Sequence, residues 1–200
     1  MGVSKQQAIE NKQAIVAAAA RLFRDRGAAA VGLTELTKAA GFTQGGFYNH
    51  FKSKDALVAA VMDDAMEGAA AQFAAGIEAS RAKAADPLRR QIEWYLSSDH
   101  RADIEAGCPL SGFAGDVRRL GEEARQTYAQ GLASNFDELA KVIDGENPQE
   151  KRRKAMVLFS QMVGSLLLSR AVVEADPALA DEILENGRRQ VLQAAEGTSP

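Results

Sequence analysis

The sequence has few of the side chains from which metal centres and nucleophilic catalytic sites are built. Cys108 is the only cysteine, and His50 and His100 are the only histidines in 200 residues. One cysteine excludes an intrachain disulfide and a cysteine-based zinc site, and two scattered histidines provide neither metal-ligand spacing nor a catalytic triad. No nucleophile elbow, P-loop or dinucleotide fingerprint is present. We therefore expect no enzyme activity, no metal and no cofactor.

Long apolar runs are also lacking. The longest apolar stretch, from Met156 to Leu168, is interrupted by serine, glutamine and glycine. It is shorter than the roughly 20 residues that a membrane-spanning helix needs. The N-terminal segment, residues 1–13, lacks the continuous apolar core of a signal peptide and is interpreted as a polar, mobile arm. These features predict a soluble cytoplasmic protein in a reducing compartment, with no membrane partner.

No segment alternates apolar and polar residues over a useful length, so the sequence offers no β-strand. Apolar residues recur instead at helical spacing, and the pairs Asp86-Pro87, Asn147-Pro148 and Asp176-Pro177 are typical helix starts. The predicted fold is all-α, with about nine helices and a frayed tail from residue 196. The helices are expected at about 6–26, 33–40, 44–51, 54–83, 87–98, 109–119, 121–143, 148–174 and 177–194.

Charge is distributed unevenly along the chain. The net charge of the whole protein is −3, but residues 1–54 carry +5 and the remainder −8. A basic N-terminal segment followed by an acidic remainder indicates that the first part meets a polyanion. Ordinary unevenness of surface charge is the alternative, and charge alone does not choose between the two.

Residues 33–51 have the form of a helix-turn-helix, with two short helices, a turn containing Gly41 and a polar second helix. The segment LTELTKAAGFTQGGFYNHFKSKDAL closely resembles the signature of the TetR/AcrR family. The resemblance implies a three-helix DNA-binding domain at residues 1–54, followed by a helical ligand-binding and dimerisation domain at 55–200. It also implies a homodimeric repressor, released from a palindromic double-stranded operator by a small-molecule effector.

The predicted DNA contacts lie in and around the third helix. Gly45 and Gly46 each cost a helix up to about 1 kcal/mol relative to alanine, which is explained if DNA approaches the helix amides closely. A loosely held helix end is the alternative. Tyr48 is interpreted as a phosphate contact in preference to a core ring, whereas Phe47 and Phe51 are core candidates. Family members usually cap the second helix with Ser or Thr where this chain has Gly32. The full set is Thr34, Thr43, Gln44, Gly45, Gly46, Tyr48, Asn49, His50 and Lys54.

The effector pocket is predicted only from the resemblance, which implies a cavity enclosed by the middle helices. Its candidate lining residues are Met66, Trp94, Tyr95, Cys108, Phe113, Tyr128 and Met162, and ordinary core packing is the alternative for each. A Gly-Cys-Pro sequence at Cys108 also resembles a subgroup of the family. A thiol at a helix N-terminus has a lowered pKa, so a redox- or electrophile-sensing repressor acting through Cys108 is an alternative mechanism.

The last two predicted helices carry more apolar residues than a peripheral helix needs. The resemblance implies that they pair with those of a second subunit in a four-helix interface. The candidates are Phe159, Val163, Leu166, Leu167, Arg170, Leu179, Ile183 and Val191. Packing within one subunit is the alternative for some of them. The most distant alternative for the whole chain is a helical interaction protein that never binds DNA, which would leave the basic segment and paired glycines unexplained.

Overall fold

The computed structural model describes residues 4–196, and within that range all regular secondary structure is helical. Ten α-helices and one short 3-10 helix replace the nine helices expected, so the all-α prediction is confirmed. Packing divides the chain into two units, residues 1–69 with 108–131 and residues 70–107 with 132–200. This division follows packing alone, so a functional boundary after residue 54 stays a prediction.

The first unit is built on one hydrophobic core. It contains α1 (Lys5–Arg26), α2 (Leu33–Ala39), α3 (Gln44–Tyr48) and the beginning of α4 (Lys54–Ala82). It also contains α7 (Pro109–Gly112), η1 (Val117–Arg119) and the beginning of α8 (Glu122–Ala140). Its core is apolar side chains at helical spacing, among them Phe23, Leu36, Phe47, Leu57, Met62 and Phe113. The helix-turn-helix residues therefore share a core with residues far along the sequence, including Phe113.

Helix α1 begins one residue earlier than expected, at Lys5, because the Ser4 side chain accepts a hydrogen bond from the Gln7 amide. Most of the segment interpreted as a mobile arm is therefore helical, which corrects that prediction. The sequence signal that was overlooked is the capping serine, Ser4, followed by helix-forming residues. The first three residues and the last four lie outside the described residues.

The turn between α2 and α3 is fixed by a C-terminal cap that requires glycine. The Phe42 amide donates to the Thr37 carbonyl and the Gly41 amide to the Lys38 carbonyl. These two bonds form a Schellman motif, in which the residue after the C-cap adopts left-handed backbone angles. Gly41 has φ +76°, a conformation that costs glycine little. The sequence Ala-Gly-Phe thus sets the angle at which α3 leaves α2.

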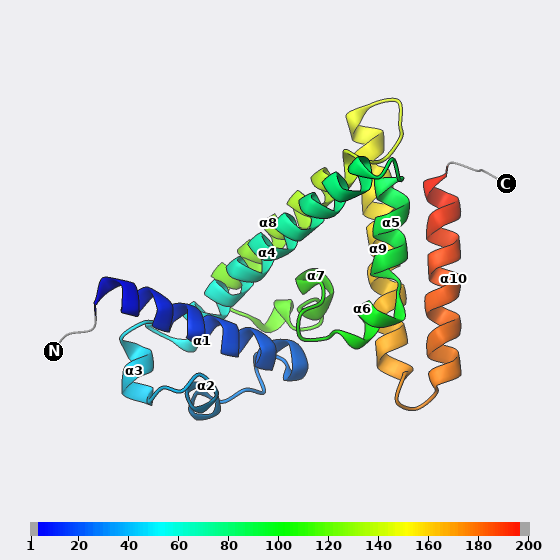
Figure 1. Cartoon of the computed structure of the whole chain (residues 1–200). Helices are drawn as coiled ribbons and strands as arrows, with labels where there is room; N and C mark the ends of the chain where they lie inside the picture. Colours follow the sequence, from blue (N-terminus) through cyan, green and yellow to red (C-terminus); the bar gives the residue numbers. More distant parts are fainter. Residues whose placement is uncertain (1–3, 197–200) are drawn as a thin grey trace. The chain divides into compact units, whose positions relative to one another are not determined.

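The second unit contains α5 (Pro87–Tyr95), α6 (Ser98–Ala102), α9 (Pro148–Val172) and α10 (Pro177–Ala195), with the ends of α4 and α8. Helices α9 and α10 lie side by side, joined by a short loop (Figure 1). Their contact is tight at Gly187, because a Cβ there would lie 2.3 Å from the Ser165 hydroxyl oxygen. The core of this unit includes Ile92, Tyr95, Leu96, Phe159, Met162, Leu166, Leu184 and Val191.

Three helix starts agree with the predicted Asx-Pro pairs. The side chains of Asp86, Asn147 and Asp176 each accept an amide hydrogen bond from their own helix, and the following proline is its first residue. A capping box at Asn147, with Glu150 three residues on, forms only in part. The Glu150 carboxylate accepts from the Glu146 amide, one residue outside the box.

Two predicted helices are interrupted. The helix expected over 87–98 ends at Tyr95, and α6 begins after Ser97, whose hydroxyl accepts from the His100 amide. The helix expected over 109–119 breaks into α7 and η1. Arg170 of α9 stabilises the C-terminal end of α6 because its guanidinium donates to the carbonyls of His100, Arg101 and Asp103 at 2.5, 3.0 and 3.1 Å. These contacts satisfy carbonyls that a five-residue helix leaves open.

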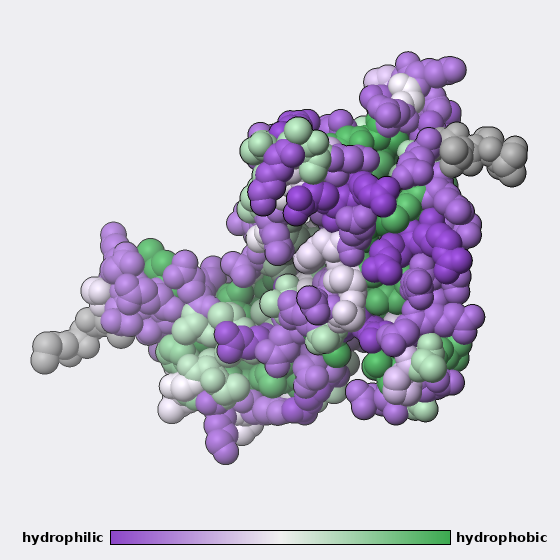
Figure 2. Space-filling view, turned by 45° about the vertical axis from the view of Figure 1, so that its right-hand side comes forward, coloured by the Kyte–Doolittle hydropathy of each residue, from purple (hydrophilic) through white to green (hydrophobic). Residues whose placement is uncertain are grey.

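Helix α9 is long and apolar enough, by length and composition alone, to cross a membrane. Sequence reasoning missed this because it considered only the interrupted stretch from Met156 to Leu168. A third of the apolar window is buried within the fold, and α9 packs against α5, α6 and α10. A core helix of a folded domain passes the same test, so the finding is weak support for a membrane location. Figure 2 shows one face of the molecule, which is mostly hydrophilic with separate hydrophobic patches.

Candidate nucleic-acid interface

Helix α3 presents an open, polar surface around its first turn. The Thr43 hydroxyl caps the helix by accepting from the Gly46 amide at 3.1 Å. A Cβ added at Gly45 would meet no atom within 4 Å, whereas one at Gly46 would lie 3.4 Å from the Thr43 hydroxyl oxygen. Packing inside the protein therefore does not require a glycine at position 45. A glycine at this position is instead explained if an external molecule approaches the amides of the first turn of α3 closely.

The start of α2 is tied to the start of α3. The Gln44 side-chain amide donates to the Thr34 hydroxyl at 2.8 Å, and both residues are exposed. Gly32 occupies the N-cap position of α2 and supplies no side-chain hydrogen bond. Thr34 therefore carries a hydroxyl group at this helix end, and its role in binding DNA stays a prediction.

The aromatic residues of α3 divide into core and surface. Phe47 is fully buried, and its ring stacks on Phe51 with the centroids 5.7 Å apart, which confirms both as core residues. Tyr48 is 58% exposed, so it is not a core ring. Asn49 and His50 follow the end of α3, which is shorter than predicted, and the His50 ring meets the edge of Phe42.

Cationic side chains flank this surface. Ser53 caps α4 by accepting from the Ala56 amide, which places Lys54 in the first turn of α4. The macrodipole disfavours a cation there unless an anion lies nearby. Arg26, in contrast, forms a two-point ion pair with Glu35, so its charge is already partnered.

Lys12 is a candidate contact that sequence reasoning missed. Its ammonium lies over the Phe51 ring, 5.6 Å from the centroid, at the junction of α3 and α4. No carboxylate pairs with it among residues 4–196. Lys12 continues the face of α1 on which Val16 and Ala19 are buried, three and four residues apart. This continuation at helical spacing was the available signal.

The predicted effector residues fall in both packing units. Met66, Cys108, Phe113 and Tyr128 belong to the first unit, and Trp94, Tyr95 and Met162 to the second. Phe113, Tyr95 and Met162 are fully buried core side chains. The Tyr128 hydroxyl donates to the Leu110 carbonyl at 2.6 Å, and burial raises its pKa to about 12. Trp94 is 43% exposed and stacks on the buried His100 ring. A shared pocket for these seven residues stays a prediction.

The helix that follows Cys108 is much shorter than expected. Helix α7 has four residues, and Cys108 makes no side-chain capping hydrogen bond to it. So short a helix has little macrodipole with which to stabilise a thiolate. The structure therefore gives the proposed cysteine-sensing mechanism no support from the helix geometry on which it was based.

The predicted interface residues divide between core and surface. Phe159, Leu166 and Val191 are buried in the protomer's own core, and Arg170 is engaged with α6. Val163 and Ile183 are half-buried, whereas Leu167 and Leu179 are exposed. Sequence reasoning missed two further exposed apolar residues of α9, namely Val157 and Leu168.

Comparison with known proteins agrees with this geometry. Residues 15–61 match the family of bacterial regulatory proteins described as the tetR family. The chain is 42% identical over 60 residues to the HTH-type transcriptional regulator AcrR of Shigella flexneri, covering 30% of this chain and 28% of that protein. It is 31% identical over 100 residues to the HTH-type transcriptional regulator EthR of Mycolicibacterium smegmatis, covering 49% of this chain and 46% of that protein. These matches thus span less than half of either relative.

The fold similarity extends much further than the sequence similarity. The crystal structure of Escherichia coli NemR in its reduced form superposes with a TM-score of 0.75 and 20% identity. The superposition covers 93% of this chain and 97% of NemR. At that identity the likeness is one of fold. The match over residues 15–61 thus makes the helix-turn-helix similar to that of the tetR family, and the superposition shows that the chain shares the fold of NemR.

Proposed function

We propose that this protein is a transcriptional repressor that binds double-stranded operator DNA through α2 and α3. The observation that carries the proposal is the open first turn of α3, where Gly45 leaves the helix amides accessible and Tyr48 is exposed beside them. A helix inserted into the major groove reads base edges with its exposed side chains, and hydroxyl and ammonium groups around it hold phosphates. Gln44 and Asn49 are the proposed base readers.

Thr34, Thr43, Tyr48 and Lys54 are the proposed phosphate contacts, with Gly46 allowing the backbone to approach and His50 at the edge of the surface. The hydroxyls and the ammonium come from different helices, α2, α3 and α4. Phosphate contacts on several elements fix the register of a reading helix on the duplex. Regulation by binding, without catalysis, is the activity we assign to this surface.

The proposed active form is a homodimer that pairs through α9 and α10. Val157, Gly164 and Leu168 lie on one face of α9, opposite the buried residues Leu158 and Met162. Val157 and Leu168 are 63% and 61% exposed, which is unusual for two apolar side chains on one helix face. A two-fold dimer places two reading helices about 34–36 Å apart and requires a palindromic operator.

We further propose that a small-molecule effector releases the DNA by favouring a dimer whose reading helices no longer fit adjacent major grooves. The helical domain beyond residue 54 would hold that effector. A protein that acts on operator DNA in a bacterium works in the cytoplasm, and we assign it there.

The test is binding of the purified protein to DNA fragments from upstream of its own gene, in the presence of competitor DNA. Tyr48→Phe and Lys54→Ala are the test variants, and Lys141→Met in the second unit is the control. Saturable binding that both test variants weaken and the control does not supports the proposal. Binding that is indifferent to sequence and to both variants refutes it.

Dimerisation is tested separately by sedimentation of a Leu168→Glu variant. A charge on the α9 surface should convert the dimer to a monomer while helical content stays constant, because Leu168 does not belong to the protomer core. Exposed Ala171→Glu, one turn away, extends the test along the same face. A wild-type protein that sediments as a monomer, or a variant that remains dimeric, contradicts the assignment.

A further inference from the structure

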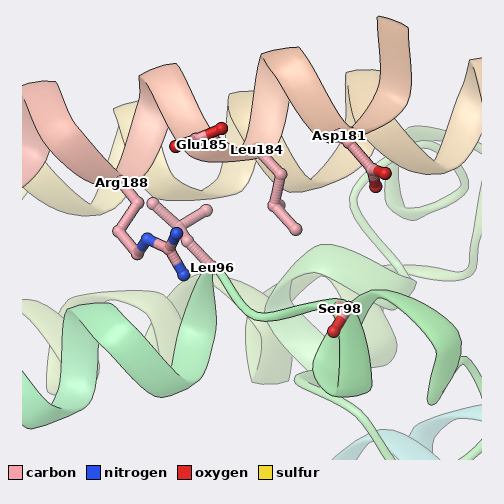
Figure 3. A pocket seen from close by; sticks show the side chains of 6 residues that line it. All are labelled: Leu96, Ser98, Asp181, Leu184, Glu185 and Arg188. Carbon is pink, nitrogen blue, oxygen red and sulfur yellow. The ribbon is translucent and has the colours of Figure 1, made fainter. Parts of the chain in front are cut away.

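The groove between α10 and the junction of α5 with α6 offers a ligand no apolar surface (Figure 3). Its two leucines, Leu96 and Leu184, are 0% and 6% exposed, and Asp181 at one end is held in an ion pair with α6 at 2.7 Å. The polar pair formed by Thr34 and Gln44 differs, because both side chains are exposed on the surface proposed to meet DNA. Each of them has hydrogen-bonding capacity left for a ligand.

Thr34 is anchored through its backbone at the start of α2. The hydroxyl of the buried Thr37 donates to the Thr34 carbonyl at 3.1 Å, which holds the main chain at that position. The neighbouring Glu35 is engaged by Arg26 of α1 in a two-point ion pair. The acidic group next to Thr34 is therefore already partnered, and it repels an approaching phosphate less than a free carboxylate would.

Hydrogen-bond polarity determines which atoms of this pair face a ligand. The Gln44 side-chain nitrogen, Nε2, donates to Thr34 Oγ1 at 2.8 Å. A hydroxyl carries one hydrogen and a phosphate oxygen only accepts, so a Thr34 hydroxyl that accepts from Gln44 keeps its own hydrogen for the phosphate. The Gln44 carbonyl oxygen, Oε1, accepts no hydrogen bond from Thr34 in this arrangement and is left to accept from a base.

We propose that Thr34 is a positioning residue that orients Gln44 to read an amino base, adenine or cytosine, through Oε1. The hydrogen bonds run in one direction, from the base amine to Oε1, from Nε2 to Thr34 Oγ1, and from the Thr34 hydroxyl to a phosphate. In the major groove adenine N6 and cytosine N4 donate, whereas guanine O6 and thymine O4 accept. The inference rests on the proposed operator binding and names the base class that Gln44 selects.

This role makes Thr34 different from a simple phosphate contact. A phosphate contact holds the protein on every sequence alike, so its loss weakens binding about uniformly. Loss of the Thr34 hydroxyl also releases the Gln44 amide, which can then turn Nε2 toward acceptor atoms of the bases. Removing this hydroxyl therefore lowers both the affinity and the discrimination between bases at one position in each half-site.

The experiment begins with selection of operator sequences from randomised DNA by the full-length protein. Gln44→Ala identifies the base pair that Gln44 contacts, because the sequence preference should disappear at that position. Replacing its adenine with purine, or its cytosine with pyrimidin-2-one, removes only the exocyclic amine. Wild-type affinity, measured by fluorescence anisotropy, should be about fivefold higher for the natural operator than for the amine-lacking operator. Gln44→Ala should bind the two operators equally.

Thr34→Val and Thr34→Ser form the matched pair of variants. Valine nearly keeps the shape of threonine but lacks the hydroxyl, so Thr34→Val should bring the ratio of the two affinities close to one. Thr34→Ser keeps the hydroxyl and should restore the wild-type ratio. Lys54→Ala is the control for a phosphate contact alone, and it should lower both affinities while leaving their ratio unchanged. Thr34 and Gln44 are exposed, so their variants should keep the wild-type midpoint of thermal unfolding.

Three results would overturn the role of Thr34. These are equal wild-type binding of the natural and amine-lacking operators, a stronger effect of a 7-deazapurine than of amine loss, and a wild-type affinity ratio in Thr34→Val. Each is obtained with a wild-type protein that binds its selected operator, so each leaves the proposed repressor function intact. A wild-type protein that selects no sequence refutes the proposed function, and the role of Thr34 with it.

Discussion

Lys12 gives the sharpest test of how the first unit meets DNA. The sequence placed the DNA contacts between residues 34 and 54, but α1 brings the Lys12 ammonium over the Phe51 ring, beside α3 and α4. We predict that Lys12→Met reduces operator affinity without unfolding the domain. Methionine keeps the apolar part of the side chain, and Lys12 is exposed, so the core is unchanged.

The size of the effect follows from counterion release. Each phosphate neutralised by a cation contributes about 0.9 to the slope of log affinity against log salt. A dimer has Lys12 twice, so the variant should lower the slope by about 1.8. When the salt concentration rises from about 50 to about 200 mM, the ratio of wild-type to variant operator affinity should therefore fall roughly tenfold. A salt series thus separates a phosphate contact from a general loss of affinity.

The assay is fluorescence anisotropy with a labelled operator at several salt concentrations. Lys141→Met is the matched control, since it removes the same charge from the second unit, where Lys141 pairs with Glu138. The Lys12 variant with a wild-type salt slope would refute the placement of Lys12 at the phosphates. An equal change in slope for the Lys141 variant would show that net charge alone is responsible.

Three further predictions concern single positions. Gly45→Ala should raise the midpoint of thermal unfolding, because alanine favours the helix and its Cβ meets no atom within 4 Å. The same variant should weaken operator binding, and unchanged binding would contradict close approach of DNA to α3. Gly107→Ala should lower the unfolding free energy by about 1–3 kcal/mol in denaturant titration, since its Cβ meets the Asp103 carbonyl oxygen at 2.3 Å; a neutral result refutes this. Burial lowers the pKa of His100, so protonation opposes folding. Stability should therefore fall as pH drops below about 6.5, and His100→Asn should weaken that dependence in pH-resolved unfolding; an identical pH profile contradicts it.

Local hydrogen bonding explains which helix boundaries were predictable. Thr43, Ser53 and the Asx-Pro pairs all cap helices whose starts were predicted, because a side chain that bonds amides two or three residues away needs no tertiary partner. The break between α5 and α6 was missed although Ser97 is also a cap. Its signal was hidden by apolar residues at continuous helical spacing. The C-terminal end of α6 depends on Arg170, about 70 positions away, and no local pattern encodes such a contact.

The DNA-contact candidates were predictable in part for the same reason. Exposure of Tyr48 and burial of Phe47 are consistent with their adjacent positions on one short helix, whose side chains point about 100° apart. The bond from Gln44 to Thr34 joins two helices and could not be read from either alone. Lys12 was missed because a solvent-exposed lysine on α1 gains significance only when Phe51 is known to lie beside it.

Helix α9 shows why an apolar pattern alone overstates an interface. Its apolar residues occupy both faces, with Leu158, Met162 and Leu166 packed inside the protomer and Val157 and Leu168 exposed. Periodicity identifies either set as a stripe, and the sequence contains no feature that says which stripe faces inward. The structure decides this through Gly187 of α10, whose missing side chain lets α10 approach one face of α9 closely. A bulky residue at position 187 would collide with Ser165, so this glycine is required for the close packing of α10 on α9 that leaves Val157 and Leu168 exposed.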